Sequence, residues 1–440
     1  MSRVLLCNPP APRPTMRDYY CSSTSKAGYA WQPIDLLAQA AHLRDAHTLI
    51  WRDFAVSPAS PEEALRLIEG DRPDAIVGLV GAAAPDDFGF WRRVHERVDT
   101  RLFVSGDLVR FAVDETLAAY DFIDGVLLDF TAPALRDHLA GKKKVAGLAL
   151  RGKAATETKG DFAYPVPPYE LVWNLPYRHP FLPQPFATVM TDHGCVHRCA
   201  YCNSGRVTYR RHDTGNLAAE LDWLAAHHVR ALFIKDMTFN ADRERTLSIL
   251  EMLARTGPWR FACYLRPDRI DDELAEALAQ AGCAMAMVGV ESGDDDLLAA
   301  VRPGATTANT TAGVEALHRA GVPVGGHFLC GLPGETPAQR EKTLALALRL
   351  PLAYASFNLA APRLGTPLYN AGDGVADGSS TATRLLDPAQ NRTELIAWRN
   401  RAVRCFYLRP FYLGRRFGQA VRNGSLWREI NHAVALFTQR

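Results

Sequence analysis

The chain of 440 residues has almost no net charge and no long apolar run. Its 50 lysines and arginines against 48 aspartates and glutamates do not favour nucleic acid or an anionic membrane as a partner. No apolar run approaches the ~18 residues that a membrane-spanning helix needs. The N-terminal residues Met1–Leu6 lack the apolar region of a signal peptide. We therefore expect a cytoplasmic protein without a membrane span.

Cysteine is sparse outside one short stretch. Three of the nine cysteines, Cys195, Cys199 and Cys202, form a CxxxCxxC pattern directly after the apolar segment 186–190. A loop this tight can turn three thiolates toward one centre, as iron–sulfur cofactors require. Three thiolates leave one iron of a four-iron cluster open to a substrate or cosubstrate. The scattered cysteines are expected to be buried free thiols in a reducing compartment: Cys7, Cys21, Cys263, Cys283, Cys330 and Cys405.

A structural zinc site and three unrelated buried thiols are the alternatives for this stretch. Zinc usually takes four ligands in paired C-x-x-C or Cys/His groups. His193 or His197 could supply the fourth ligand.

Residues 1–140 alternate apolar strands with helices, which predicts an α/β domain with a doubly wound parallel sheet. Strands are expected at 4–7, 48–51, 75–80, 102–105 and 125–128, and helices at 33–44, 61–69 and 88–98. Ligands of such sheets bind beyond the carboxyl ends of the strands. The residues at those ends include Asn8, Asp53, Gly81 and Gly106.

Residues 141–185 and 371–440 differ in composition from the rest. The first segment is rich in proline and aromatic residues and reads as a linker that packs across two domains. The second begins with a Gly/Asp/Ser-rich stretch and continues as a mostly helical, basic and aromatic segment from Trp398. We expect it to form an amphipathic cap. Arginines among aromatics also suit RNA, anionic substrates or a membrane surface.

Residues 186–370 repeat a strand–helix unit six times, which predicts a partial (β/α)6 TIM-like barrel. Strands are expected at 187–190, 231–234, 261–265, 286–290, 324–329 and 355–359. Helices are expected at 214–228, 241–255, 271–281, 306–320 and 336–349. Barrel chemistry takes place at the carboxyl ends of the strands, and the cysteine loop follows the first strand.

Several stretches at these strand ends resemble the radical SAM superfamily. They are the CxxxCxxC loop with Tyr201 before its third cysteine, G-x-E-S-G at 289–293 and G-L-P-G-E-T at 331–336. The resemblance is strong over most of 186–370 and loose over 1–140. It implies a 4Fe-4S cluster on Cys195, Cys199 and Cys202, with S-adenosyl-L-methionine (SAM) on the open iron. It also implies a reductant such as flavodoxin or ferredoxin.

The resemblance further implies residues that hold SAM. Glu291 would accept hydrogen bonds from the ribose hydroxyls, and Arg266 would pair with the SAM carboxylate. Relatives commonly hold the SAM amino group with a Gly-Gly-Glu segment. In this chain Asp236 is the preferred residue for that contact, and Lys235 is the second choice. A helix N-terminal acid is the alternative for Glu291, and an interdomain salt bridge is the alternative for Arg266.

Three further residues are placed at the cofactor site by the same resemblance. They are Tyr201, Ser292 and Gly326. With its neighbour Gly325, Gly326 would permit close backbone approach to the adenosyl group, and packing against a helix is the alternative. Catalytic residues are not identified.

The N-terminal part resembles the cobalamin-binding domain of one class of radical SAM enzymes. The similarity rests on Val4-Leu-Leu-Cys-Asn-Pro-Pro and on the helix that opens at Pro33 after Trp31-Gln32. It implies that Asn8, Asp53 and Gly106 surround a corrinoid. No D-x-H-x-x-G follows the second strand, so no histidine is placed to bind cobalt from below. A degenerate domain without a corrinoid is the alternative.

The sequence thus predicts a radical SAM enzyme that acts on a small molecule. The cofactors supply the radical chemistry, and the protein binds, orients and excludes water. With cobalamin the expected outcome is methylation of an unactivated carbon in a small molecule or natural-product intermediate. Without it, rearrangement, cyclisation or alkyl transfer is expected. A non-catalytic zinc or nucleic-acid-binding protein is the alternative from another class.

Overall fold

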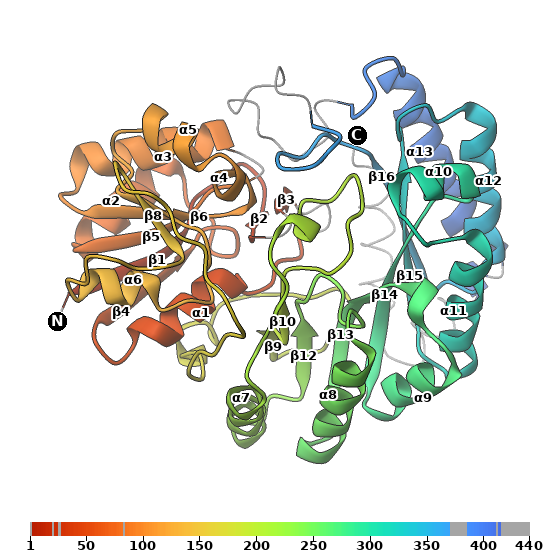
Figure 1. Ribbon diagram of the computed structural model, residues 1–440, viewed down its shortest axis with the longest axis horizontal. Helices are drawn as coiled ribbons and strands as arrows, with labels where there is room; N and C mark the ends of the chain where they lie inside the picture. Colours follow the sequence, from red (N-terminus) through yellow and green to blue (C-terminus); the bar gives the residue numbers. More distant parts are fainter. Residues whose placement is uncertain are drawn as a thin grey trace.

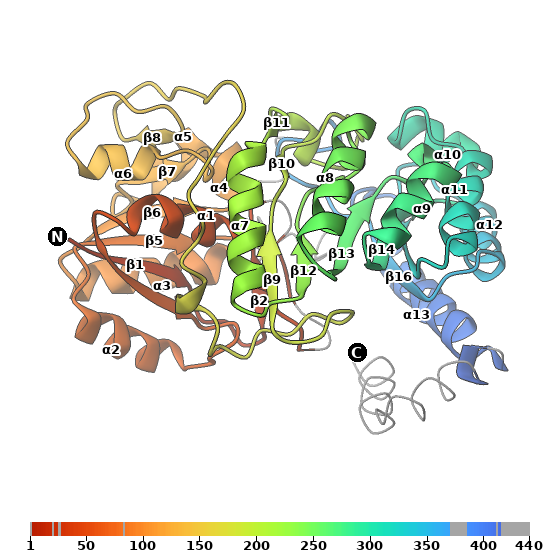
Figure 2. The same cartoon turned by 90° about the horizontal axis from the view of Figure 1, so that it is seen from below.

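The computed structural model describes residues 2–19, 22–24, 28–81, 84–369, 385–410 and 412–414. It contains two six-stranded sheets with helices on their faces (Figure 1). Seen from below, the N-terminal sheet lies at one end of the molecule, and the second sheet runs from β9, near the centre beside α7, toward the other end (Figure 2). The α/β fold class predicted from the sequence is confirmed.

The N-terminal sheet is doubly wound. Its strand order is β4-β1-β5-β6-β7-β8, and all neighbours are parallel except β7 and β8. The order reverses at β1, which makes the β1/β5 boundary the switch point where such sheets bind ligands. The strands are β1 (Arg3–Asn8), β4 (Thr48–Asp53), β5 (Ala75–Leu79), β6 (Arg101–Ser105), β7 (Gly125–Leu127) and β8 (Leu148–Leu150). A hairpin of β2 (Thr15–Arg17) and β3 (Ser22–Thr24) follows β1.

Helices cover both faces of this sheet because its central strands are apolar on both sides. One face packs against α2 (Pro61–Asp71) and α3 (Ala84–Arg97), and the other packs against α1 (Ile34–Leu43) and α6 (Ala134–Leu139). The short helices α4 (Asp107–Phe111) and α5 (Val113–Ala119) follow β6. Every residue of α1 is buried, because the helix lies between this sheet and the barrel.

The second sheet is a partial barrel of six parallel strands in the order β16-β15-β14-β13-β12-β9. In Figure 1 its helices follow the convex side of the curved sheet. The strands are β9 (Phe186–Val189), β12 (Ala231–Ile234), β13 (Arg260–Leu265), β14 (Cys283–Glu291), β15 (Val324–Cys330) and β16 (Tyr354–Leu359). The helices are α7 (Thr214–Ala226), α8 (Arg243–Thr256), α9 (Asp272–Gln280), α10 (Asp295–Val301), α11 (Thr307–Arg319), α12 (Pro337–Arg349) and α13 (Arg392–Tyr407).

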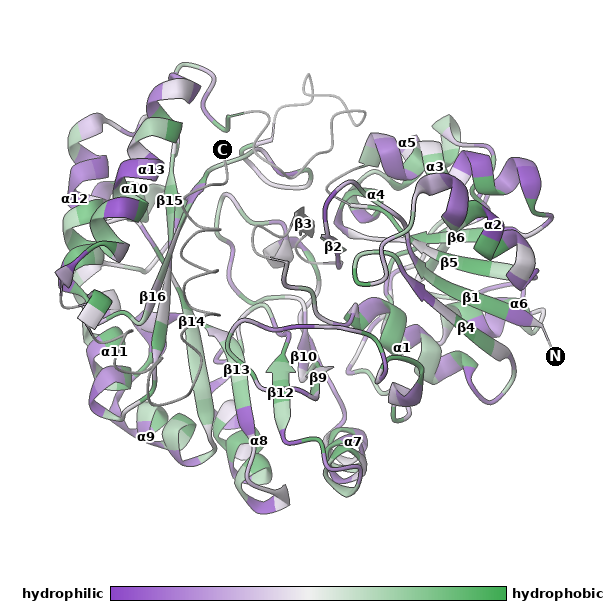
Figure 3. Cartoon of the chain, turned by 180° about the vertical axis from the view of Figure 1, so that it is seen from behind, coloured by the Kyte–Doolittle hydropathy of each residue, from purple (hydrophilic) through white to green (hydrophobic). Residues whose placement is uncertain are grey.

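Side-chain caps fix where the barrel helices begin. Thr306 and Thr336 form capping boxes with Asn309 and Gln339 at the starts of α11 and α12. Aspartate side chains cap α7, α8, α9 and α10 in the same way. Apolar residues concentrate on the strands of both sheets, and hydrophilic residues on the outward faces of the helices (Figure 3).

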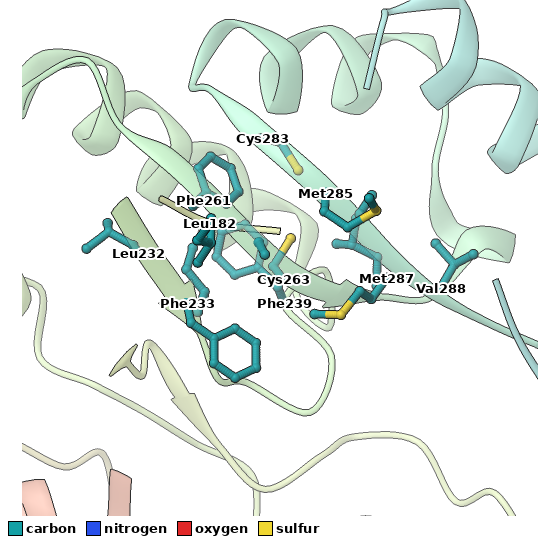
Figure 4. Close-up of a cluster of buried hydrophobic side chains, with 14 of the residues drawn as sticks. Leu182, Leu232, Phe233, Phe239, Phe261, Cys263, Cys283, Met285, Met287 and Val288 are labelled. Carbon is teal, nitrogen blue, oxygen red and sulfur yellow. The ribbon is translucent and has the colours of Figure 1, made fainter. Parts of the chain in front are cut away.

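The barrel core is rich in sulfur. Cys263, Cys283, Met285 and Met287 gather beside Phe261 (Figure 4). Burial raises the pKa of the Cys263 thiol well above its usual value, so the thiol stays protonated. The prediction of buried free thiols is confirmed for four of the scattered cysteines: Cys7, Cys263, Cys283 and Cys330. Cys405 is exposed, and Cys21 lies outside the described residues.

Segment 141–185 ties the two parts together. Its first residues supply the antiparallel edge strand β8, which the sequence analysis assigned to the linker. The Tyr177 hydroxyl donates to Asp53 at 2.7 Å, and the Phe181 ring packs on Tyr354 at 5.4 Å. Gln32 donates to the carbonyl of Phe186 in β9 at 2.9 Å. One hydrophobic core therefore extends from α1 through the linker into the barrel.

The C-terminal helix α13 packs on the outside of β16. The Trp398 ring contacts Phe357 at 6.0 Å, and the Tyr407 hydroxyl donates to the carbonyl of Ala355 at 2.7 Å. Most of the segment interpreted as a cap, including 370–384 and 415–440, lies outside the described residues. None of the described helices has the length and apolar character needed to cross a membrane.

Candidate functional site

The cysteine loop lies at the carboxyl edge of the barrel sheet, after β9. Its start is held by the carboxylate of Asp236, which accepts from the backbone N–H of Thr191 at 2.7 Å and of Asp192 at 3.1 Å. The Thr191 hydroxyl donates to the same carboxylate. A side chain at Gly194, where φ is +77°, would approach the carbonyl of Thr208 to 2.6 Å. The loop is therefore packed too tightly to move freely.

The three loop thiols are half-buried, and Cys202 lies near enough to Cys195 and Cys199 to affect the pKa of both. Burial raises the pKa of Cys195 and, to about 11, that of Cys199. The nearby Cys202 raises both pKa values further, while Arg266 opposes the rise. Among the described residues, no three His, Cys, Asp or Glu side chains are grouped as one metal ion requires. An iron–sulfur cluster spreads its thiolates over different irons, so the assignment of these three cysteines as ligands stays a prediction.

Glu291 ends β14 beside this loop in a left-handed backbone conformation, with φ of +66°. Its side chain accepts a hydrogen bond from Tyr201, which precedes the third cysteine. A side chain at Gly289 would collide with Oε1 of Glu291, which explains the glycine of the G-x-E pattern. Burial raises the pKa of Glu291, although the charge of Arg302 and the bond from Tyr201 partly offset it.

Arg266 is paired within the protein. Its Nε and Nη2 donate to Oδ1 and Oδ2 of Asp268 at 3.0 and 2.6 Å, and Arg302 donates to the same Oδ1 at 3.0 Å. Burial alone would raise the pKa of Asp268, but the two arginines hold it below its ordinary value. Two arginines and the two carboxylates of Asp268 and Glu291 thus form a balanced cluster next to the cysteine loop. An incoming SAM carboxylate would meet an Arg266 that Asp268 already orients.

Asp236 and Lys235 have partners other than those predicted. Both oxygens of Asp236 serve the start of the cysteine loop, and burial raises its pKa to about 7. Lys235 pairs with Asp18 at 3.1 Å and lies over the ring of Trp31 at 5.4 Å. The structure therefore shows Asp236 as a residue that positions the loop, and its contact with the SAM amino group stays a prediction.

Gly326 faces away from the barrel interior. A side chain there would approach Leu352 to 2.7 Å and Phe328 to 3.0 Å, on the helix side of β15. Its neighbour Gly325 faces the interior, where Tyr354 is 3.4 Å away. Gly325 and not Gly326 is therefore the glycine on the interior side, because alternate residues of a strand face opposite sides, and the contact of Gly326 with the adenosyl group stays a prediction.

Ser292 belongs to the turn that leads into α10. Its Oγ accepts from the N–H of Asp294 at 3.2 Å and lies 3.3 Å from the hydroxyl of Thr343. These contacts shape the segment after Glu291, and a direct contact between Ser292 and the cofactor stays a prediction.

The residues predicted around a corrinoid all lie at the carboxyl edge of the N-terminal sheet, at the ends of β1, β4 and β6, and two of them, Asn8 and Asp53, are in contact. Asn8 donates to Asp53 at 2.8 Å and accepts from Arg17 at 2.8 Å. Arg17 is fully buried and paired with Asp87 at 2.7 Å. Gly106, where φ is +144°, packs so closely on the Val80 carbonyl that a side chain would collide with it. These polar atoms are engaged within the protein, and their contact with a corrinoid stays a prediction.

Sequence reasoning missed Asp35, in the first turn of α1. Its Oδ2 accepts from the Ser105 hydroxyl at 3.2 Å, while its buried Oδ1 has no hydrogen-bond partner among the described residues. Burial raises the pKa of Asp35 to about 8, and the charge of Asp18 adds to the rise. An acidic residue that opens an otherwise apolar helix was the available signal.

Several known proteins are similar to this chain. Residues 190–347 match the model of the Radical SAM superfamily. The chain is 25% identical to an uncharacterized methyltransferase of Pyrococcus horikoshii over 363 residues, which is 78% of each chain. It is 26% identical to the tryptophan 2-C-methyltransferase of Streptomyces laurentii over 190 residues, which is 39% of this chain and 32% of that protein.

Two solved structures share the fold. TsrM from Kitasatospora setae, with cobalamin and a [4Fe-4S] cluster bound, superimposes with a TM-score of 0.64 and 20% identity over 83% of this chain and 77% of that chain. OxsB, with aqua-cobalamin bound, gives a TM-score of 0.71 and 14% identity over 99% of this chain and 72% of that chain. Residues 190–347 thus match the Radical SAM superfamily, and the chain, including its N-terminal doubly wound domain, shares the fold of these two cobalamin-bound structures.

Proposed function

We propose that this enzyme is a radical SAM methyltransferase that uses cobalamin to methylate an unactivated carbon of a small molecule. The observation that carries the proposal is the fixed cysteine loop beside the Tyr201–Glu291 pair. Together they provide three thiols and a buried carboxylate at one strand edge. The methyltransferase relatives support the direction of the chemistry.

The loop residues fit a metal cluster by the chemistry of the donor set. The thiols of Cys195 and Cys199 ionise poorly by themselves, because burial and the neighbouring Cys202 both raise their pKa values. A bound metal centre reverses this balance. Cys195, Cys199 and Cys202 would hold the cluster. When bound, the cluster and SAM supply one-electron reductive cleavage of the SAM sulfonium.

The chain's own residues bind and orient SAM in this proposal. Glu291, fixed by the hydroxyl of Tyr201, accepts from ribose hydroxyls. Arg266, held by Asp268 in a bidentate pair, attracts the carboxylate. Asp236 keeps the start of the cysteine loop in place, so that the thiols stay in position beside Glu291.

Asp35 is the observation that favours a corrinoid in the N-terminal domain. A buried carboxyl oxygen without a partner is uncommon and calls for an explanation. Because the pKa of Asp35 is about 8, the group is largely protonated at pH 7 and can both donate and accept. The amide side chains that surround a corrin ring offer the matching donors and acceptors. When bound, cobalamin supplies a transferable methyl group.

Radical chemistry without a corrinoid is the second candidate. It is favoured by the closed contacts of Arg17, which fill part of the sheet edge by pairing with Asp87 and Asn8. In that case the N-terminal domain would act as a structural support for the barrel.

We also infer a reducing, cytoplasmic setting, with flavodoxin or ferredoxin as the electron donor. All eight described cysteines are free thiols, as expected where disulfides are rare.

The test uses anaerobically purified and reconstituted enzyme. Titration with hydroxocobalamin should show saturable binding in the micromolar range. Incubation with SAM and dithionite should then yield both 5'-deoxyadenosine and S-adenosylhomocysteine. If no corrinoid bound and 5'-deoxyadenosine were the sole product, the second candidate would replace the proposal. If neither product formed with a fully loaded cluster, both would be excluded.

A further inference from the structure

Five aromatic or polar side chains lie on the inner face of the barrel sheet, the face that also carries Met287. We name them the inner wall: Tyr264, His327, Tyr354, Ser356 and Asn358. All five are half-buried. Phe328 and Phe357, which alternate with them on β15 and β16, are buried against the helices at 0% and 3% exposure. The inner wall is therefore on the less tightly covered side of these two strands.

Aromatic rings make up one part of the inner wall. The ring centroid of His327 lies 6.2 Å from that of Tyr264 and 6.5 Å from that of Tyr354. The Phe181 ring packs on Tyr354 and closes the wall from the linker side. Such faces stack well on flat, unsaturated rings.

Uncharged polar atoms make up the other part. The buried Nε2 of His327 has no hydrogen-bond partner among the described residues. Burial lowers the pKa of His327 to about 4, so the imidazole is neutral at pH 7. Next to it in register, Ser356 accepts from Asn358 at 3.1 Å. The five side chains carry no formal charge, and the cation that touches them, Lys235 over the ring of Tyr264 at 5.5 Å, is neutralised by Asp18 at 3.1 Å, so the wall is suited to a neutral ligand.

The position of the inner wall matches that of a substrate site. His327 pairs in register with Gly289, the glycine that makes room for the Glu291 carboxylate. A ligand on the inner wall would therefore lie one step along the strands from the predicted ribose contact.

Building on the proposed function, we propose that the inner wall binds the substrate and that the substrate is a planar, uncharged heteroaromatic ring. A ring nitrogen of this substrate forms a hydrogen bond with Nε2 of His327. His327 is thus a specificity-determining residue, and Tyr264 and Tyr354 supply the stacking faces.

The test compares three flat bicyclic probes on the reconstituted enzyme with SAM. Indole offers an N–H donor, quinoline offers a nitrogen acceptor, and indene has no ring nitrogen. Competition measured by saturation-transfer NMR should show that at least one of the two heterocycles binds about fivefold more tightly than indene, or tighter still. A factor of this size is the effect of one net hydrogen bond. In His327→Phe this ratio should fall to about one, and His327→Gln should restore part of it.

His318→Gln is the matched control, since His318 is exposed on α11 and should leave the ratio unchanged. Circular dichroism and iron content confirm that each variant is folded and loaded. Failure of all probes to bind, the absence of a preference in the unaltered enzyme, or a preference that survives His327→Phe would overturn the inference. Probe binding without S-adenosylhomocysteine formation would instead overturn the proposed function and leave the inner wall in place.

Discussion

The carboxyl edges of the two sheets use their polar residues in opposite ways. At the N-terminal edge, Asn8, Asp53 and Arg17 satisfy one another, and Asp35 keeps an open carboxyl oxygen. At the barrel edge, three thiols and the inner wall stay half-buried, while Asp236 and the arginine–carboxylate cluster have their partners within the protein. A strand end therefore indicates where a site lies, but the partners brought from elsewhere in the chain decide which atoms remain available to a ligand.

Removing one loop thiol should have the largest effect. Cys199→Ala should lose most of the bound iron and all SAM cleavage, because a four-iron cluster cannot be held by two thiolates. Iron and sulfide analysis and the visible absorbance of anaerobically purified protein measure this. Cys405→Ala is the matched control, since Cys405 is exposed on α13. Equal iron in both variants would show that the loop is not the cluster site.

Removing the ion pair of Arg17 and Asp87 at the carboxyl edge of the N-terminal sheet should destabilise the fold strongly. Arg17→Met leaves Asp87 buried without its ion partner, and we expect a loss of about 3–5 kcal/mol in the free energy of unfolding. Replacing both partners, with Arg17→Met and Asp87→Leu, should recover much of that loss. Urea unfolding measures both. A single variant as stable as the unaltered enzyme would mean that this edge is not closed by the ion pair.

Asp35 should make stability depend on pH. Its folded pKa of about 8 exceeds the ordinary value of 3.8, so its favourable contribution is complete below about pH 4 and is lost as the pH rises through 8. Asp35→Asn stays neutral and should gain a few kcal/mol over the unaltered corrinoid-free protein between pH 5 and pH 8.5. Urea unfolding at both pH values tests this. A constant difference between the two proteins would refute the assignment of a buried, protonated Asp35.

The smallest effect is expected at Gly326. Gly326→Ala places a methyl group against the end of Leu352, which should cost about 1–2 kcal/mol of stability. The affinity of this variant for SAM, measured by equilibrium dialysis, should be unchanged because position 326 faces the helices. A large loss of SAM affinity at unchanged stability would support a contact of Gly326 with the adenosyl group.

Sequence reasoning located the elements and strand ends well. The helix expected at 306–320 is α11 at Thr307–Arg319, because Thr306 caps its start and the apolar spacing fixes its length. The cysteine loop, Tyr201 and Glu291 lie together as their strand-end positions predict. Capping residues, apolar spacing and strand ends depend on a few neighbouring residues, so they can be recognised without knowledge of the fold.

The rest depends on partners that are distant in the chain. Arg17 meets Asp87 across 70 residues, and this pair decides whether Asn8 is available. Which of Gly325 and Gly326 faces the interior depends on strand register, since a shift of one residue exchanges the two faces. The antiparallel strand β8 lies within a stretch that composition assigns to the linker. Long-range pairing, not local propensity, determined each of these outcomes.

The most direct test of the account is electron paramagnetic resonance of the reconstituted, reduced enzyme with and without SAM. The account predicts a four-iron signal whose g-values change when SAM is added, because one iron lacks a protein thiolate and binds the cosubstrate. Stoichiometric zinc without iron, or a four-iron signal that does not respond to saturating SAM, would contradict it.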